Sequence, residues 1–411
     1  MMKILIVGQY FWPENFRINE VADTLSQADC TITVLTGPPN YPEGRVFPGY
    51  SSMRMRTERR GSVLIHRVPL VLRGSGSFFR LIANYLSFVV SASILGPWML
   101  RRQAFDVILV YAPGPLLQAI PAIWLGSIKR AKVVTWVQDL WPESLEVTQV
   151  VRNRILLKAI VHCIRWIYRH NDLLLVQSRS FVEPVRNLAG RTQVIYHPNP
   201  GELPVGETAG QDPRLRLNRG FNVVFAGNLG TVQALDTILA AAENMRDHFD
   251  VWWVVVGSGS RGQWMANEVQ RRGLKQVVLA GRFPPDLMQP ILSQASALLV
   301  SLVRSPIMSK TVPSKIQAYL AAGRPIIAAL DGEGARVVTE AGAGLACPAE
   351  DAEALGAAVL ELKSLTDDEL DRMGQAGRRY YQEHYDPQVL GARMLDCLQH
   401  VVAGTLIEPL R

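Results

Sequence analysis

The chain has 411 residues, of which 48% are hydrophobic and 19% charged, and its formal net charge is +7. This composition excludes a disordered chain, and the length suits two domains better than one. Four scattered cysteines without metal-like or disulfide-like spacing favour a reduced, cytosolic compartment. They are Cys30, Cys163, Cys347 and Cys397.

Positive charge is concentrated in the N-terminal half of the chain. Residues 1–200 carry 23 Lys and Arg against 12 Asp and Glu, a net charge of +11, whereas residues 201–411 have a net charge of −4. A basic half indicates an anionic partner, such as a phospholipid surface or a phosphate-bearing substrate. Nucleic acid is disfavoured, because the sequence has no recognition motif and no repeat of aromatic and basic residues.

The N-terminal half alternates short apolar runs with helical stretches. The runs predicted to form strands are 3–7, 31–35, 63–69, 107–111, 133–137 and 173–177. Short apolar runs separated by helices are typical of a parallel sheet that is covered on both faces. The first run is too short for the apolar core of a signal peptide, so it is predicted to be the first strand.

The apolar segment 81–100 is long enough to cross a bilayer. It contains Asn84 and an internal Gly96-Pro97 pair, and Arg80 and Arg101 flank it. Three alternatives stay open: a membrane span, a buried crossover helix, or a crossover helix that also touches a membrane. The flanking arginines and the aromatic residues favour monotopic membrane contact over a fully soluble surface.

Polar residues follow the first predicted strand. Glu14 and Arg17 lie in segment 8–19, which leads into a predicted helix. A guanidinium near a helix start can bind a phosphate, because the helix dipole and the side-chain charge act together. Both residues are therefore candidate substrate contacts. The alternative is that Arg17 pairs with Glu20 or Asp23.

Two carboxylates follow the predicted strand 133–137. Asp139 comes directly after Gln138, and Glu143 lies four residues further on. A carboxylate at the end of such a strand can orient or deprotonate a hydroxyl group of a ligand. Asp139 is thus a candidate catalytic residue and Glu143 a candidate substrate contact. For Glu143, a structural role as an N-cap or in an ion pair has equal weight.

A second α/β pattern follows segment 198–220, which is polar, rich in Gly and Pro, and interpreted as a linker. The predicted strands of this half are 221–226, 250–256, 276–280, 297–301, 325–330 and 343–347. Right-handed crossovers make each half a doubly wound, Rossmann-like domain, with ligands at the carboxyl ends of the strands. We therefore predict an α/β fold of two facing domains with a cleft between them.

Two turns in the second half can hold phosphate groups. Segment 225–230 can place backbone N–H groups, Asn228 and Gly230 against a phosphate, although it lacks the full dinucleotide fingerprint. Arg282 follows another predicted strand and could reach a diphosphate. The sequence has no Walker loop, nucleophile elbow or metal-ligand cluster, so no metal is expected.

Segment 312–327 is the most informative part of the chain. It reads as a loop, a helix with Ser314 as its N-cap, a turn at Gly323, and a strand. A loop that feeds a helix N-terminus in an α/β domain can hold an anion, and Lys310 and Lys315 flank this position. The alternative is a well-capped surface helix with solvated lysines.

Together, five segments resemble one family. They are 9–19, 39–44, 138–144, 225–230 and 312–315. Over nearly its whole length the chain resembles a family 4 (group 1) glycosyltransferase of the GT-B fold. More narrowly, the five segments are similar to those of the O-antigen and capsule subgroup often described as L-fucosamine transferases.

This resemblance implies an activity and a domain plan. The reaction would be a metal-independent, retaining transfer of an N-acetylated deoxysugar, without a cofactor, from a UDP-sugar as co-substrate. The acceptor would be a sugar on undecaprenyl diphosphate, and the enzyme would lie peripherally on the cytoplasmic face of the membrane. Residues 1–199 would bind the acceptor, 200–385 the nucleotide sugar, and a C-terminal helix in 386–411 would cross back to the first domain.

Several positions depart from the broad family. The usual pair of glutamates falls on Lys310 and Ala318, and the usual Arg and Lys of the phosphate loop fall on Asn228 and Gln233. The subgroup resemblance suggests that the positive charge is re-sited. We expect Lys310, Lys315 and Arg282 to neutralise the leaving UDP beside Thr311 and Ser314, with Lys315 acting in catalysis.

The resemblance also implies front-face attack, in which the donor phosphate takes the acceptor proton and Asp139 positions the acceptor. Two other functions stay open. A UDP-sugar epimerase pairs similar domains but needs no basic, membrane-facing half. A catalytically silent nucleotide-sugar-binding scaffold would explain the missing glutamates.

Overall fold

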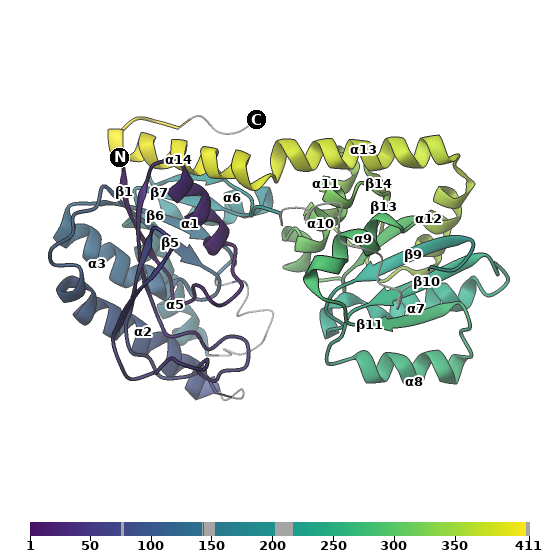
Figure 1. Ribbon diagram of the computed structural model, residues 1–411, viewed down its shortest axis with the longest axis horizontal. Helices are drawn as coiled ribbons and strands as arrows, with labels where there is room; N and C mark the ends of the chain where they lie inside the picture. The colour runs from purple at the N-terminus through teal and green to yellow at the C-terminus, as the bar shows by residue number, and fades with distance from the viewer. Residues whose placement is uncertain (75–77, 142, 144–152, 202–216, 408–411) are drawn as a thin grey trace. The chain divides into compact units, whose positions relative to one another are not determined.

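The chain forms two compact units. The computed structural model describes the chain except for residues 75–77, 142, 144–152, 202–216 and 408–411 (Figure 1). Unit 1 comprises Met1–Pro200 together with Pro387–Arg411, and unit 2 comprises Gly201–Asp386. The C-terminal helix α14 (Pro387–Ala403) packs on helix α1 (Ile18–Gln27), so the end of the chain belongs to the first unit.

The sheet of unit 1 has the strand order β3-β4-β2-β1-β5-β6-β7-β8. Its strands are β1 (Lys3–Val7), β2 (Thr31–Thr36), β3 (Arg56–Arg60), β4 (Val63–Arg67), β5 (Val107–Ala112), β6 (Lys132–Val137), β7 (Leu173–Val176) and β8 (Gln193–Tyr196). All pairs are parallel except β3 with β4. The six strands expected from the sequence are present, and β3 and β8 are additional. β3 is a polar edge strand, so it carries no apolar run that could reveal it.

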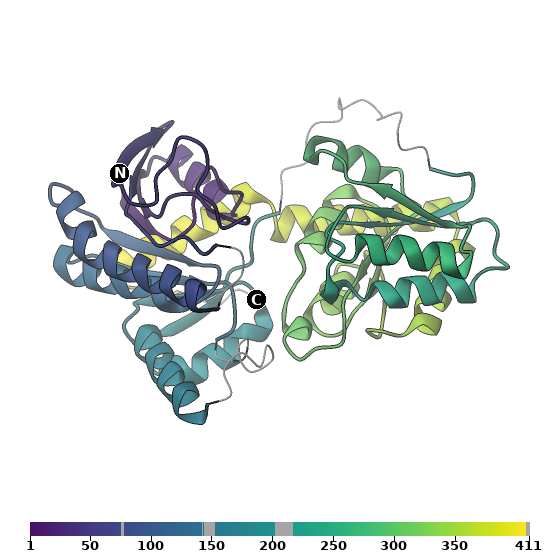
Figure 2. The same ribbon diagram turned by 90° about the horizontal axis from the view of Figure 1, so that it is seen from below.

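Helices cover both faces of this sheet, as Figures 1 and 2 show. Besides α1 and α14 they are α2 (Phe78–Met99), α3 (Ala119–Lys129), α5 (Arg154–Arg169) and α6 (Val182–Ala189). One core layer lies between the sheet and α2, α3, α5 and α6, and the other lies between the sheet and α1 and α14. Burial on both faces explains why the central strands are apolar throughout.

Helix α2 connects β4 to β5, and one of its faces belongs to the core of unit 1. Phe88 and Ala92 are fully buried. Asn84 is also buried, where it accepts a hydrogen bond from Gln9 Nε2 at 2.5 Å and donates one to the carbonyl of Val71 at 2.6 Å. By length and composition alone, Phe79–Met99 could cross a membrane. The buried face makes α2 a crossover helix of the domain.

Unit 2 repeats the plan with a fully parallel sheet in the order β11-β10-β9-β12-β13-β14. Its strands are β9 (Phe221–Ala226), β10 (Val251–Val256), β11 (Val277–Gly281), β12 (Ala297–Ser301), β13 (Ile326–Ala329) and β14 (Gly344–Cys347). Its helices are α7 (Leu235–Asn244), α8 (Gly262–Arg272), α9 (Met288–Ser293), α10 (Ser314–Ala322), α11 (Glu333–Glu340), α12 (Ala352–Ser364) and α13 (Asp367–His384). α7, α8 and α12 cover one face, and α9, α10 and α11 cover the other.

The strand order places a switch point in each sheet. In unit 1 the chain proceeds from β1 outward to β2 and later returns to β5 on the other side of β1. In unit 2 the same reversal occurs between β9 and β12. Loops diverge at such points and leave a crevice at the carboxyl ends of the strands, where doubly wound domains bind ligands.

The two faces of α2 generate a stability prediction. Replacing the fully buried Phe88 by Ala should lower the free energy of unfolding by about 3–5 kcal/mol, because the contacts of the ring are lost and a cavity remains. Ile94 lies on the same helix but is 66% exposed, so Ile94→Ala should change stability by less than about 0.5 kcal/mol. Urea denaturation of the two variants tests this, and equal losses would contradict the assignment of the faces.

Candidate functional site

A pocket of about 500 Å³ opens at the carboxyl ends of β1, β5, β6 and β7 in unit 1. Its aromatic walls are formed by Tyr10, Phe16, Tyr41, Tyr85 and Tyr111, and we call it the tyrosine pocket. Several of these rings contact one another; the Tyr10 and Phe16 rings stack with centroids 5.1 Å apart. The lining also includes the polar side chains of Gln138, Asp139, Gln177, Asn199 and Arg73, together with Pro113 and Gly114. Aromatic walls with few polar groups suit a ligand that presents both ring faces and hydroxyl groups.

Asp139 follows β6 and lies in the tyrosine pocket, as expected for a residue at the end of a central strand. Its side chain reaches solvent, but the surrounding protein removes enough water to raise the pKa of the carboxyl above its usual value. A carboxylate in this position can accept a hydrogen bond from a hydroxyl group of a bound ligand.

Arg73 brings a positive charge into the same pocket. Its guanidinium carbon lies 5.3 Å from the centroid of the Tyr41 ring. The charge of Arg73 also opposes the burial that raises the pKa values of Tyr10 and Tyr85. Within the described residues, no carboxylate lies within 4 Å of Arg73. Among the described lining residues, Arg73 and Asp139 thus carry opposite charges without forming an ion pair, so the guanidinium can still contact an anionic group of a ligand.

Glu14 holds two loops of unit 1 together. One carboxylate oxygen accepts hydrogen bonds from the backbone N–H groups of Asn40 at 2.8 Å and Tyr41 at 2.7 Å, and the other accepts from Phe11 at 3.3 Å. Burial raises the pKa of Glu14 to about 7, although these three bonds oppose the shift. Glu14 does not line the tyrosine pocket; it positions Tyr41, which does. Its expected contact with substrate stays a prediction.

The other two candidates of unit 1 lie apart from this lining. Arg17 immediately precedes α1 and pairs with Glu20 at 3.1 Å, which was the structural alternative for this residue. Glu143 is partly buried; burial raises the pKa of Tyr168, and the charge of Glu143 adds to this shift. Residues 144–152, which follow Glu143, lie outside the described part of the chain.

In unit 2, the loops after β9 and β10 pack directly on each other. The N–H of Gly227 donates to the carbonyl of Val256 at 2.8 Å, and the N–H of Leu229 donates to Ser258 at 2.9 Å. Gly257 has a φ of +141°, and a side chain there would overlap the carbonyl of Gly227. Only glycine permits this approach. The packing leaves Asn228 exposed at the surface of the loop.

Lys315 lies beneath this loop. Its ammonium group donates a hydrogen bond to Gln233 Oε1, and Nζ lies 3.8 Å from the centroid of the Phe225 ring. A Cβ atom on Gly227 would come within 2.5 Å of Lys315 Cε. Burial lowers the pKa of Lys315 to about 7. The amine therefore lies between the side chain of Gln233 and the Phe225 ring.

Helix α10 is fixed to β9 through Tyr319. Its buried hydroxyl accepts a hydrogen bond from the N–H of Ala226 at 2.9 Å and donates to the carbonyl of Ala226 at 3.2 Å. The expectation that Ser314 caps α10 is wrong: Pro313 is the N-cap, and Ser314 is the first helical residue, with an exposed side chain. Proline at the cap leaves the first N–H groups of α10 without a side-chain acceptor from that residue.

The remaining candidates of unit 2 lie on neighbouring segments. Lys310 ends a short 3-10 helix, Met308–Lys310, and the Thr311 hydroxyl donates to the carbonyl of Ile307 at 3.1 Å. Arg282 is exposed directly after β11, which is the edge strand of the sheet. The place of Arg282 in the sheet therefore does not by itself bring its side chain to Lys315.

Sequence reasoning missed one buried carboxylate, Glu333. It begins α11, is only 4% exposed and pairs with Arg336. Gly332 before it has a φ of +79°, and a side chain there would overlap the carbonyl of Ser309. The backbone at Gly332, directly before Glu333, therefore packs against the Met308–Lys310 turn. An acidic residue after a strand and a glycine was the available signal.

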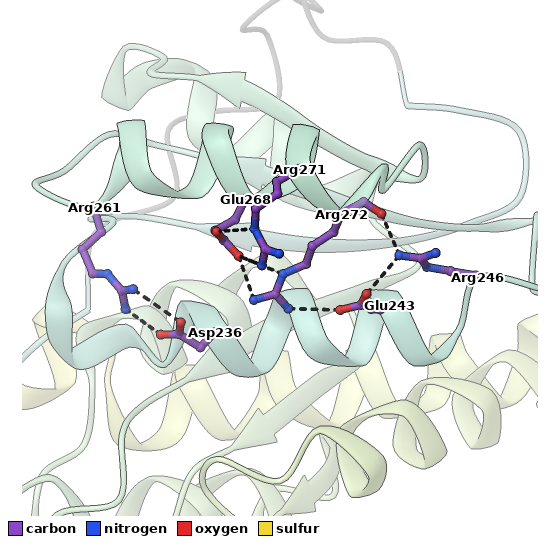
Figure 3. A network of polar contacts seen from close by, with 7 residues as sticks. All are labelled: Asp236, Glu243, Arg246, Arg261, Glu268, Arg271 and Arg272. Carbon is purple, nitrogen blue, oxygen red and sulfur yellow. Dashed lines mark hydrogen bonds and ion pairs between the residues drawn. The ribbon is translucent and has the colours of Figure 1, made fainter.

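Other arginines of unit 2 are already neutralised. Figure 3 shows Arg272 between Glu243 of α7 and Glu268 of α8, with contacts of 3.2 and 2.9 Å. Arg261 pairs with Asp236 at 2.6 Å in the same network. These arginines tie α7 to α8 and have acidic partners, which distinguishes them from a cation that awaits an anionic ligand.

Comparisons with known proteins match both units. Residues 15–200 match the family model "Glycosyl transferase 4-like domain", and residues 220–364 match "Glycosyl transferases group 1". The putative colanic acid biosynthesis glycosyl transferase WcaI of Escherichia coli K12 is 24% identical over 344 residues, covering 78% of this chain and 82% of the relative. The probable glycosyltransferase WbjE of Pseudomonas aeruginosa is 23% identical, covering 80% of this chain and 83% of its own.

Solved structures share the fold over almost the whole chain. Sucrose-phosphate synthase from Thermosynechococcus elongatus matches with a TM-score of 0.74 at 15% identity, over 98% of this chain and 100% of its own. Anabaena HepE in complex with UDP matches with a TM-score of 0.69 at 12% identity, over 97% of this chain and 100% of its own. The predicted GT-B fold, built from two Rossmann-like domains, is confirmed.

The burial of Lys315 generates a prediction about its titration. Its folded pKa of about 7 lies below the unfolded value, so between these two values the unfolded chain binds more protons. The free energy of unfolding should therefore rise with pH above about 7, and Lys315→Met should flatten this rise. Lysine NMR titration and denaturation at several pH values test both points. The exposed Lys275→Met variant is the control, and titration of Lys315 above pH 9 would contradict the prediction.

Proposed function

We propose that the chain transfers a sugar from a UDP-sugar to a lipid-linked saccharide in surface polysaccharide biosynthesis, because both of its units match glycosyl transferase family models. The name of the WcaI relative refers to colanic acid biosynthesis, and two of the similar structures contain UDP. The observation that carries the proposal is the amine of Lys315, buried beneath the glycine loop that follows the first strand of unit 2.

The donor diphosphate is proposed to bind where this loop meets α10. Lys315 supplies a positive charge, and the helix N-terminus adds backbone N–H groups and its dipole. Asn228 and Gly230 would contribute through the loop, and Thr311 and Ser314 through their hydroxyl groups. Lys310, which ends the Met308–Lys310 turn, and Arg282, which follows the edge strand β11, are proposed as further positive charges for the donor. A cation that is shielded from water, as Lys315 is, stabilises the charge that develops on a leaving diphosphate.

The proposed reaction is a retaining, front-face substitution. The bond from the anomeric carbon to the diphosphate oxygen breaks, and the acceptor oxygen forms its bond to that carbon on the same face. The acceptor proton passes to the leaving phosphate oxygen, so neither an enzyme nucleophile nor a metal takes part. Asp139, which lines the tyrosine pocket, is proposed to orient the acceptor hydroxyl.

Helix α2 supports peripheral attachment to the cytoplasmic face of a membrane. Residues along one face of α2 are large, apolar and exposed, and we call them the α2 stripe: Phe79, Ile82, Leu86, Val90, Ile94 and Trp98. Their spacing of three or four residues places them on one side of the helix. Arg101 and Arg102 follow the helix and would face anionic headgroups.

The donor site can be tested directly by calorimetric titration without metal. UDP should bind in preference to GDP and ADP, and Lys315→Met should weaken UDP binding by about tenfold or more, the loss of one charge-assisted hydrogen bond. Lys275→Met should bind UDP like the unaltered chain. A preference for GDP or ADP would contradict a UDP-sugar donor while leaving the family unchanged.

Asp139 should affect transfer rather than donor binding. Asp139→Asn is expected to lower turnover with a lipid-linked acceptor by about 100-fold, while UDP affinity stays unchanged. Asp29→Asn, at an exposed position of unit 1, is the matched control. A glycosyl adduct trapped on Asp139 would overturn front-face attack. Release of a new free UDP-sugar without acceptor would instead favour an epimerase, and UDP binding without transfer would favour a silent scaffold.

A further inference from the structure

A second cavity of unit 1, about 480 Å³ in volume, combines basic and apolar walls. Its lining includes Arg45, Leu70, Val71, Leu72 and Arg80, and we call it the Arg45/Arg80 cavity. It lies at the N-terminal end of α2, whose third residue is Arg80. A cavity that pairs guanidinium groups with aliphatic side chains fits a ligand that is anionic at one end and apolar at the other.

Two glycines bring the walls of this cavity together. Gly44 and Gly74 have φ values of +71° and +61°, and a side chain on Gly44 would overlap the backbone of Gly74. A Cβ atom on Gly74 would lie 2.7 Å from Nη1 of Arg80. The guanidinium of Arg80 therefore covers the backbone at Gly74, at the point where the two loops meet.

The Arg45/Arg80 cavity and the tyrosine pocket share one segment of chain. Leu72 and Gly74 line the cavity, whereas Arg73 between them lines the tyrosine pocket. Helix α2 holds this segment: the Val71 carbonyl accepts from Asn84 at 2.6 Å, and the Val71 N–H donates to Ser87 Oγ at 2.9 Å. The tyrosine pocket and the Arg45/Arg80 cavity therefore both border segment 72–74.

In the part of the chain that the structure describes, the two arginines of the cavity and the neighbouring Arg73 form no ion pair with an acidic side chain. In the described ranges, no carboxylate lies within 4 Å of Arg45, Arg73 or Arg80, although Glu43 also lines the cavity. The arginines of the α7–α8 network in unit 2 are paired, by contrast (Figure 3). Guanidinium groups bind phosphate oxygens in bidentate geometry, so a diphosphate would satisfy neighbouring arginines that acidic side chains leave uncompensated.

The α2 stripe begins next to the Arg45/Arg80 cavity. Phe79, its first residue, immediately precedes Arg80 and is 82% exposed. From there the stripe runs along the helix to Trp98. We propose that the Arg45/Arg80 cavity binds the diphosphate of a polyprenyl-diphosphate-linked acceptor, with Arg73 on its sugar-facing side and the isoprenoid chain along the α2 stripe. This inference rests on the proposed function for its assumption of a lipid-linked acceptor.

The test measures binding of farnesyl diphosphate to the full chain by calorimetry, with farnesol and inorganic pyrophosphate as partial ligands. Farnesyl diphosphate should bind more tightly than either, because only it has both the charge and the apolar chain. The double variant Arg45→Gln/Arg80→Gln should weaken this binding by about tenfold or more. Arg59→Gln/Arg191→Gln, at two exposed positions of unit 1 outside the cavity and α2, is the matched control and should bind normally.

Vesicle binding distinguishes a diphosphate site from a lipid-headgroup site, and UDP binding tests the donor proposal separately. Phosphatidylglycerol vesicles present a headgroup phosphate; an equal loss of vesicle and farnesyl diphosphate binding in the double variant would overturn a diphosphate site in favour of a headgroup site. Unchanged farnesyl diphosphate binding in that variant would overturn the inference outright. UDP binding should be unaltered in both variants, so failure of the donor proposal would appear separately.

Discussion

The burial of one amine, that of Lys315, is the constraint on which the account of unit 2 depends. Nζ lies against Gln233 and the Phe225 ring, and burial lowers the pKa of this lysine to about 7. Tyr319 fixes α10 to β9, and the glycine loop closes over the lysine. A charged amine is disfavoured in such a place unless an anion joins it. The site is therefore poised for a ligand that brings negative charge.

Unit 1 uses its buried polar groups differently. Glu14 accepts three backbone hydrogen bonds, and Asn84 joins Gln9 to Val71. These bonds fix the loops that carry the aromatic walls of the tyrosine pocket and the segment that carries Arg73. Because buried polar groups must be paired, such networks specify loop positions closely. The pocket thereby gains a defined shape from residues that do not line it.

The fold is largely predictable from the sequence, whereas the site is predictable only in outline. β9 and β12 have the predicted bounds because buried parallel strands are continuous apolar runs. β3 was missed because an exposed edge strand carries no such run. The contact of Lys315 with Gln233 joins residues 82 positions apart and depends on how α10 packs on β9, which no local pattern records. Local patterns likewise suggested substrate contacts for Glu14 and Arg17, which in the structure contact backbone amides and Glu20, respectively.

The central claim, that the amine of Lys315 neutralises a UDP donor, predicts proton uptake when UDP binds. Calorimetry at pH 8 in buffers of different ionisation enthalpy measures this uptake. An amine with a pKa of about 7 is mostly neutral at pH 8 and becomes protonated beside a diphosphate, so about one proton should be taken up per UDP. The uptake should disappear in Lys315→Met. UDP binding without proton uptake, or with the same uptake in that variant, would contradict the account.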